Sequence, residues 1–446
     1  MYDVIIVGAG PAGIFSALEI SSSGKGLRVL LVEKGHDLPQ RQPKEVFCGW
    51  GGAGTFSDGK LNLSPHVGGS LLDYVDEGGL EDLINYVDEI YLRFGAPKTL
   101  HGTREEEVKR LEAAAARNGL KLLPFKIRHL GTDRCLSLLN GIRTEMEGKV
   151  EMRFDSEVAD IVPDGEIIRL KTKTGEGFTG RFVIIAPGRG GTPWLRDMTI
   201  RLGLSTVNNP VDIGVRVEVP AFVLMPITDI VHEAKFIFSS KRFDDQVRTF
   251  CMNPYGEVVK EVHKDFITVN GHSYSTRKTE NTNFAILVST RFTEPFKEPI
   301  AYGQHITKLA NLLGGGIIVQ RLGDLLQGRR STHERIRKGA VMATLQDATP
   351  GDLSFAIPYR YITDILEMLE ALDKVAPGIY SASTLLYGVE VKLYSMRLKL
   401  ANTLETEIKN LFAIGDGAGI TRGIIQASVS GVIAAREVIR RVGSKE

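Results

Sequence analysis

The chain opens with an apolar strand that runs into a Gly-x-Gly-x-x-Gly turn, Tyr2-Asp-Val-Ile-Ile-Val-Gly8-Ala-Gly10-Pro11-Ala12-Gly13. The apolar run Val4 to Val7 predicts a strand covered on both faces, as in a parallel sheet. Gly8 permits a tight turn, Gly10 lets the backbone approach a pyrophosphate, and Gly13 allows close packing of helix on strand. A helix over about Pro11 to Ser22 then points its N-terminal amides at the phosphates.

The residues after this fingerprint complete a nucleotide-binding pattern. A second apolar strand, Leu27 to Val32, ends at Glu33, followed by Lys34. An acidic side chain about twenty residues after the last glycine accepts the hydroxyls of an adenosine ribose. Val158 follows a strand that we expect beside the one ending at Glu33, so its backbone should meet the adenine. Strand, turn, helix and acid in register predict a bound dinucleotide.

A motif near the other terminus indicates that the dinucleotide is FAD. Asn410 to Ile414 is an apolar strand running into Gly415-Asp416, and a helical stretch follows Gly423-Ile424-Ile425. Flavoproteins place an Asp in this position on the ribityl chain. The next helix N-terminus would stabilise negative charge at the flavin N1–O2 edge. The small-residue strand Phe182 to Gly188 is expected to close the sheet beside the cofactor.

A second glycine-rich segment, Cys48 to Leu61, contains Gly51, Gly52, Ala53 and Gly54. So many small residues imply backbone packed against a large flat group, with these amides facing pyrophosphate or flavin. Ser57 and Lys60 would then lie near the reactive ring. The alternative is a solvated surface loop.

This segment resembles a family of bacterial and archaeal FAD-dependent dehydrogenases, mostly of unassigned substrate. Its members carry Gly-Gly-Ala-Gly-Thr-Phe-Ser-Asp-Gly-Lys-Leu almost letter for letter, and the likeness covers nearly the whole chain. It continues at His129-Leu-Gly-Thr-Asp133, Pro210 to Arg216, Val269 to Tyr274 and Gln320 to Asp324. More broadly, the chain is similar to the single-nucleotide-fold flavoproteins that include geranylgeranyl reductases, a likeness of fold that implies little about function.

The chain departs from that family at two segments expected to border the flavin. Cys251-Met-Asn-Pro-Tyr-Gly256 stands where many relatives have Cys-Met-Cys-Pro-Gly-Gly. Glu390-Val-Lys-Leu-Tyr-Ser395 stands where many have Glu-x-Arg-Thr-Ser-Ser-Pro. These departures suggest a different substrate.

Composition indicates a cytoplasmic enzyme. The 446 residues carry a net charge of +1, so we expect no nucleic-acid partner, and no apolar run is long enough for a membrane span. The first strand begins at Tyr2, which leaves no room for a signal peptide. Cys48, Cys135 and Cys251 form neither a Cys-x-x-Cys nor a zinc motif. This spacing argues against a vicinal redox disulfide and suggests a reducing compartment.

The predicted fold class is α/β: a discontinuous FAD-binding Rossmann-like domain with an inserted α+β substrate domain. Residues 1–200 form the first part of the FAD-binding domain, with a helical insertion at about 61–128. Residues 201–390 form the substrate domain, and residues 391–446 return to the FAD-binding domain. Because the sequence contains no second Gly-x-Gly-x-x-Gly motif after a strand, no separate NAD(P)H domain is expected. The electron donor or acceptor must then meet the flavin directly.

The predicted function is hydride transfer between a small-molecule substrate and flavin N5. Lys60, Glu390 and His129 are the catalytic candidates. Lys60 would stabilise reduced flavin, Glu390 would carry the substrate proton, and His129 would be the next proton donor. Alternatively, Lys60 and Glu390 form a structural ion pair and His129 is a packing residue.

Two other functions remain open from the sequence. One is a flavin-dependent reductase of isoprenoid-type double bonds, which an elongated apolar cavity would favour. The other is an FAD-binding electron-transfer module, which an exposed flavin edge would favour. The electron partner is unknown; NAD(P)H and a ferredoxin both fit.

Overall fold

The computed structural model describes residues 1–42, 47–57, 59–207, 209–263, 265–274, 277–290, 292, 296, 298–393 and 396–443. These residues form two compact units. Unit 1 comprises Met1–Leu100, Ile127–Asn209 and Ser395–Glu446, and unit 2 comprises His101–Lys126 and Pro210–Tyr394. Both units mix helices and strands, so the predicted α/β class is confirmed.

Unit 1 is built on one twisted sheet with the strand order β6-β2-β1-β9-β8-β7, and β21 also pairs with β9. Its strands are β1 (Tyr2–Val7), β2 (Val29–Val32), β6 (Val150–Arg153), β7 (Val158–Asp164), β8 (Ile167–Thr172), β9 (Gly177–Ile185) and β21 (Leu411–Ala413). Strands β6, β2, β1, β9 and β21 run parallel, whereas β8 is antiparallel to β7 and β9. The expected neighbour of the strand ending at Glu33 is indeed β6, which starts at Val150.

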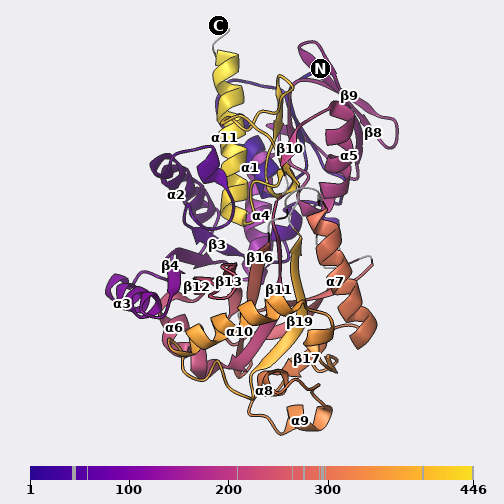
Figure 1. The fold of residues 1–446 in the computed structure, drawn as a ribbon. Coiled ribbons are helices and arrows are strands. Elements are labelled where there is room, and N and C mark those ends of the chain that lie inside the picture. Colours follow the sequence, from indigo (N-terminus) through magenta and orange to yellow (C-terminus); the bar gives the residue numbers. More distant parts are fainter. Residues whose placement is uncertain are drawn as a thin grey trace. The chain divides into compact units, whose positions relative to one another are not determined.

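The sheet of unit 1 is covered by helices. They are α1 (Pro11–Ser21), α2 (Glu77–Arg93), α4 (Thr132–Met146), α5 (Thr192–Leu202) and α11 (Ile424–Gly443). Short ribbons add β3 (Lys60–Leu63) with β5 (Lys126–His129), and β10 (Thr206–Val207) with β20 (Arg397–Leu398). Helices α1 and α11 lie side by side (Figure 1). They approach closely because Gly431 has no side chain: a Cβ there would lie 2.2 Å from the Ala12 carbonyl oxygen.

Unit 2 contains a mixed sheet with the order β18-β17-β19-β11-β16-β13-β12-β4. Its strands are β4 (Leu120–Leu123), β11 (Val211–Pro220), β12 (Lys235–Ser239), β13 (Gln246–Asn253), β16 (Asn281–Thr290), β17 (Ile318–Arg321), β18 (Thr349–Pro350) and β19 (Leu385–Leu393). A separate hairpin pairs β14 (Glu257–Val262) with β15 (Ile267–His272). The helices are α3 (Glu105–Ala116), α6 (Ala221–Val231), α7 (Pro299–Gly314), α8 (Leu322–Leu326), α9 (His333–Arg337) and α10 (Tyr359–Asp373).

The central strand β11 shows how its sequence divides the faces of this sheet. Successive side chains of a strand point to opposite faces. The odd-numbered residues Val211 to Val219 belong to the apolar core of unit 2. The even-numbered residues Asp212, Arg216 and Glu218 lie on the other face and are nevertheless at most 1% exposed. Such burial is stable only if each charge finds partners.

The domain boundaries differ from the expected ones in one respect. Residues 101–126, placed by the sequence in an insertion of the FAD-binding domain, belong to unit 2. The reason is strand pairing, because β4 adds to the sheet edge beside β12, with Leu122 opposite Phe236. Helix α3 packs against α6 of the same unit. The change of unit at Asn209 and Pro210 lies close to the expected boundary.

Candidate functional site

The three fingerprint glycines, Gly8, Gly10 and Gly13, have different structural roles in unit 1. A Cβ at Gly8 would lie 2.2 Å from the Ala186 carbonyl oxygen, and one at Gly13 would lie 1.9 Å from the Gly8 carbonyl oxygen. Both are therefore required by the protein's own packing. A Cβ at Gly10 would meet no protein atom within 4 Å. Gly10 is also the N-cap of α1, so its backbone is open where the helix amides point, as a pyrophosphate requires.

Glu33 is 5% exposed, and its carboxylate accepts three backbone hydrogen bonds. Oε2 accepts from the amide of Ala9 at 2.8 Å. Oε1 accepts from the amides of Gly35 at 2.9 Å and Gly49 at 2.8 Å. A carboxylate offers about four acceptor positions, so one position on Oε2 remains for a ribose hydroxyl. Glu33 thus links the fingerprint turn to the glycine-rich segment through hydrogen bonds, and it keeps one acceptor position for the cofactor.

The glycine-rich segment folds back onto the fingerprint. The amide of Gly51 donates to the Ala9 carbonyl oxygen at 2.8 Å. A Cβ at Gly52 would lie 3.1 Å from the Gly10 Cα, and one at Gly54 would lie 3.7 Å from the Pro11 Cγ. Gly52 is buried, and the segment's short 3₁₀ turn covers Gly52–Gly54. This placement fits a cofactor cradle better than a solvated loop.

Arg41 belongs to no motif of the sequence, yet its side chain organises this segment. Its Nη1 donates to the carbonyl oxygens of Trp50 at 2.6 Å and Gly52 at 2.9 Å, and also to the Thr55 hydroxyl. Arg41 is 8% exposed and stacks on Phe56, with the guanidinium carbon 4.9 Å from the ring centroid. Because the carbonyls turn toward Arg41, the shape of the turn is fixed. No local sequence pattern links position 41 to positions 50–55.

The C-terminal motif contacts α1 at Ala12. A Cβ at Gly415 would lie 3.0 Å from the Ala12 Cβ, and the Gly415 amide donates to Ser430 Oγ at 3.1 Å. Asp416 Oδ1 accepts from Thr421 Oγ1 at 2.7 Å, while Oδ2 lies 3.5 Å from Arg189 Nε. Burial raises the pKa of Asp416, and Arg189 and Thr421 act to lower it.

The N-terminal end of α11 is held by a loop at residues 65–69. The Arg422 amide donates to the Gly68 carbonyl oxygen at 2.7 Å, and a Cβ at Gly423 would lie 3.4 Å from the Gly68 Cα. Gln426 Nε2 donates to the carbonyl oxygens of Pro65 at 2.9 Å and Val67 at 3.1 Å. Ile424 and Ile425 open the helix, as the sequence predicts. A helix N-terminus carries partial positive charge, which suits an electron-rich flavin edge.

The remaining predicted cofactor residues lie in the same unit. Gly188 follows β9 with φ of +59°, and a Cβ there would meet no protein atom within 4 Å. Lys34 Nζ donates to the Gly190 carbonyl oxygen at 3.3 Å, and Ser57 Oγ donates to the Gly54 carbonyl oxygen at 3.0 Å. Val158 is buried and opens β7. Ala53 sits within the turn Gly52–Gly54.

Two of the three catalytic candidates are neighbours in unit 1. Lys60 opens β3 and His129 ends β5, and the two strands pair. The Leu130 amide donates to the Gly59 carbonyl oxygen at 3.0 Å, which brings both residues to one end of the ribbon. Both side chains are half-buried. Lys60 supplies an amine and His129 an imidazole, two groups that can hold charge or exchange a proton.

Glu390 belongs to unit 2 and is fully buried in an ion-pair network. Its carboxylate accepts from Arg216 Nε at 2.7 Å and Arg216 Nη2 at 2.9 Å, and it lies 3.0 Å from Lys392 Nζ. Burial acts to raise the pKa of Glu390, but Arg216 and Lys392 outweigh it and hold that pKa below its usual range. Glu390 is therefore an ionised anchor, which makes proton transfer by this side chain costly.

Three structural features are absent from the described part of the chain. None of the three cysteines is in a disulfide. Among the described residues no cluster of three or more His, Cys, Asp or Glu side chains is placed to hold a metal ion. The helices in those ranges also lack the length and apolar character needed to cross a membrane.

Comparison with known proteins connects these features to flavoproteins. Residues 2–209 match the family model of pyridine nucleotide-disulphide oxidoreductases, and residues 210–393 match that of the FAD-dependent protein, C-terminal domain-like family. An uncharacterized protein of Clostridium beijerinckii is 28% identical over 478 residues, covering 98% of this chain and 80% of the relative. Between them the two family models match residues 2–393, and the C-terminal model describes an FAD-dependent protein, which confirms the predicted cofactor.

Two of the solved structures that match this chain align with 98% or more of it at low identity. Glycine oxidase from Geobacillus kaustophilus is 16% identical with a TM-score of 0.41, covering 98% of this chain and 95% of the oxidase. The 2,6-dihydroxypyridine-3-hydroxylase from Arthrobacter nicotinovorans is 11% identical with a TM-score of 0.42, covering 100% of this chain and 84% of the hydroxylase.

Proposed function

We propose that this protein transfers a hydride between a small-molecule substrate and the N5 atom of a noncovalent FAD. The main observation behind this proposal is that three segments of the chain come together at the N-terminus of α1. Gly52 packs against Gly10, and Gly415 packs against Ala12, on the helix whose N-cap is open. When bound, FAD would supply the two-electron chemistry that no side chain provides.

Residues of unit 1 would bind both halves of the cofactor. The amides at the start of α1 and in the glycine turn would bind the pyrophosphate. Glu33 would accept from the ribose through its remaining position on Oε2, and the backbone of Val158 would meet the adenine. Asp416 would accept from the ribityl chain, and the first turn of α11 would face the flavin N1–O2 edge.

For the companion proton we favour the Lys60–His129 pair over Glu390. An imidazole ring can accept a proton on one nitrogen and return it, which suits general acid–base chemistry. Glu390 is kept ionised by two cations, which makes it a positioning residue for Arg216 and Lys392. Lys60 would stabilise the charge of the reduced cofactor.

The electron partner would reach the flavin directly, without a second nucleotide domain. NAD(P)H and a reduced ferredoxin remain the two candidates. The cysteine pattern favours action in a reducing compartment, for which the cytoplasm is our proposal.

The test is anaerobic mixing of the purified yellow protein with NADH, NADPH or reduced ferredoxin, followed at the flavin absorbance. Bleaching by one donor, and recovery on adding a small-molecule acceptor, is the expected result. Protein that stays colourless after reconstitution with FAD would refute the cofactor assignment. Protein that binds FAD and exchanges electrons only with another protein would instead identify an electron-transfer module.

A further inference from the structure

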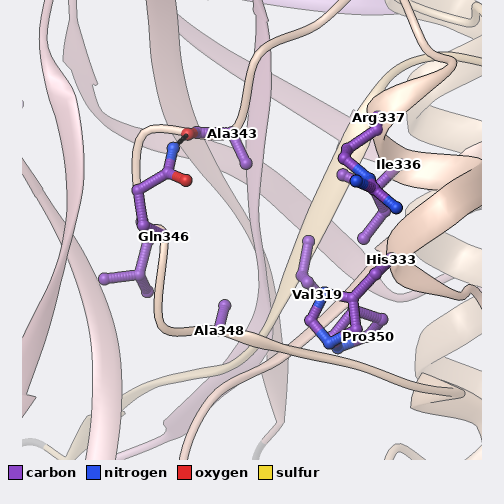
Figure 2. A pocket seen from close by; sticks show the side chains of 9 residues that line it. Val319, His333, Ile336, Arg337, Ala343, Gln346, Ala348 and Pro350 are labelled. Atoms are coloured by element: carbon purple, nitrogen blue, oxygen red, sulfur yellow. Dashed lines mark hydrogen bonds between the residues drawn. The ribbon is translucent and has the colours of Figure 1, made fainter.

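Unit 2 contains a pocket whose residues have no part in the proposed cofactor site. It has a volume of about 410 Å³ and lies between β17, α9 and the segment 343–350. Figure 2 shows α9 on one side, contributing His333, Ile336 and Arg337, and Ala343, Gln346 and Ala348 on the other. A volume of a few hundred Å³ is typical of small-molecule sites.

The floor of the pocket is apolar. Val319 from β17, Ile336, Leu345 and Pro350 line it, together with Ala348. Val319 and Ala348 belong to a buried apolar cluster, and Ile336 and Leu345 pack against that cluster. A surface of this kind favours a ligand with an apolar body, because contact removes hydrocarbon from water on both sides.

The chain segment around the pocket carries a net positive charge. Residues 321–350 contain six basic and three acidic residues, in a chain whose net charge is only +1. The acids are already engaged: Asp324 lies 2.8 Å from Arg329, Glu334 lies 2.6 Å from Lys338, and Asp347 pairs with a lysine outside the segment.

Arg337 lines the pocket and has no counterion among the residues that the structure describes. Within the described ranges, its guanidinium forms no hydrogen bond or ion pair, and neither does the His333 imidazole. The two residues are four apart on α9, so their side chains share a helix face. An unpaired guanidinium over an apolar floor is suited to a carboxylate or phosphate on a hydrocarbon body.

We propose that this pocket binds a small organic anion, with its apolar body against Val319 and Ile336 and its acidic head on Arg337 beside His333. One cationic end and one apolar floor match a ligand with a single anionic head, rather than a polyanion. The inference goes beyond the proposed oxidoreductase activity and stands independently of FAD.

The test uses equilibrium dialysis of radiolabelled octanoate against the full-length protein. Octanoate is expected to bind, and Arg337→Gln should weaken that binding about tenfold or more through loss of a charge-assisted contact. Lys338→Gln is the matched control: it removes the same charge from the next position, outside the pocket lining, and should change binding less than twofold. Ala343→Phe, which fills the pocket without changing charge, should also weaken octanoate binding.

Competitors separate the two parts of the ligand. Octanol, which lacks the acid, and inorganic phosphate, which lacks the apolar body, should each compete at least tenfold less well than octanoate. Equal loss in Arg337→Gln and Lys338→Gln would overturn the proposal in favour of general electrostatic attraction. Unchanged binding in Arg337→Gln, or octanol competing as well as octanoate, would also overturn it. FAD content measured in the same samples keeps this result separate from the oxidoreductase proposal.

Discussion

Replacing Glu33 by Gln tests the double role that the structure gives this carboxylate. Gln keeps one acceptor oxygen and exchanges the other for an NH₂ donor. If the Gln oxygen accepts from the amides of Gly35 and Gly49, the NH₂ group faces the amide of Ala9, and two donors then point at each other. The opposite orientation keeps the hydrogen bond from the Ala9 amide and loses those from the amides of Gly35 and Gly49. Either way at least one buried N–H loses its acceptor, which costs about 1–3 kcal/mol of unfolding free energy.

The same substitution should weaken FAD binding, because the ribose would lose a hydrogen bond to a charged group. Such bonds contribute about 1.5–3 kcal/mol, so the dissociation constant should rise tenfold or more. Glu33→Ala removes both acceptor oxygens, and with them all three hydrogen bonds, and should be more damaging than Glu33→Gln in both respects. Glu176→Gln is the matched control, since Glu176 is exposed and lies in a hairpin turn.

The assay is urea unfolding of the apoprotein followed by tryptophan fluorescence, with FAD titrations on the same samples. Trp50 and Trp194, the two tryptophans of the chain, lie in unit 1, so the signal reports the unit under test. A Glu33→Gln protein with an unchanged unfolding midpoint and unchanged FAD affinity would refute the reasoning. Lower stability with unchanged affinity would restrict Glu33 to the scaffold.

Four further predictions follow from other positions. Asp416→Ala should raise the FAD dissociation constant by a factor of ten or more, measured by calorimetry, because a charge-assisted hydrogen bond of about 1.5–3 kcal/mol is lost. Lys60→Gln should slow flavin reduction or reoxidation in stopped-flow traces while FAD content and melting temperature stay unchanged. Gly10→Ala should leave the apoprotein as stable as wild type yet abolish FAD retention, whereas Gly13→Ala should lower the melting temperature, since only Gly13 has protein atoms in the way. Burial raises the pKa of Asp364 in α10 to about 6, so the contribution of this carboxyl to the unfolding free energy should fall as pH rises from about 4 to above 6. In urea titrations at each pH, the difference in unfolding free energy between wild type and Asp364→Asn should therefore shrink over that range.

The cofactor half of the fold was predictable because its signals are local. A strand, a turn, a helix and an acid within the first 33 residues follow rules of short range, and the structure has β1, α1 and β2 where the sequence places them. The unit assignment of residues 101–126 depends instead on β4 pairing with β12, more than a hundred residues away. The amphipathic pattern of α3 shows that it covers a sheet but does not say which one.

The site residues likewise divide into those with a local sequence signal and those whose roles depend on contacts between distant parts of the chain. Gly8, Gly10 and Gly13 were identifiable from spacing alone. Arg41 was not, because its role arises only when the chain brings the carbonyls of residues 50 and 52 around one guanidinium. For Glu390, alternation along a strand predicts that it shares a face with Lys392. It does not predict that Arg216 of β11 reaches the same carboxylate.

Two buried carboxyls of unit 2 show why partner identity, rather than burial, decides which group exchanges a proton. Glu390 and Glu218 are both 0% exposed. Glu390 faces two cations, and its pKa falls below the usual range. Burial raises the pKa of Glu218, which receives hydrogen bonds from Thr344, Tyr387 and Asn281 but has no cation among its partners in the described residues. Hydroxyl and amide donors neutralise less charge than a guanidinium does. Of these two carboxyls, Glu218 therefore takes up a proton more readily, and Glu390 stays ionised.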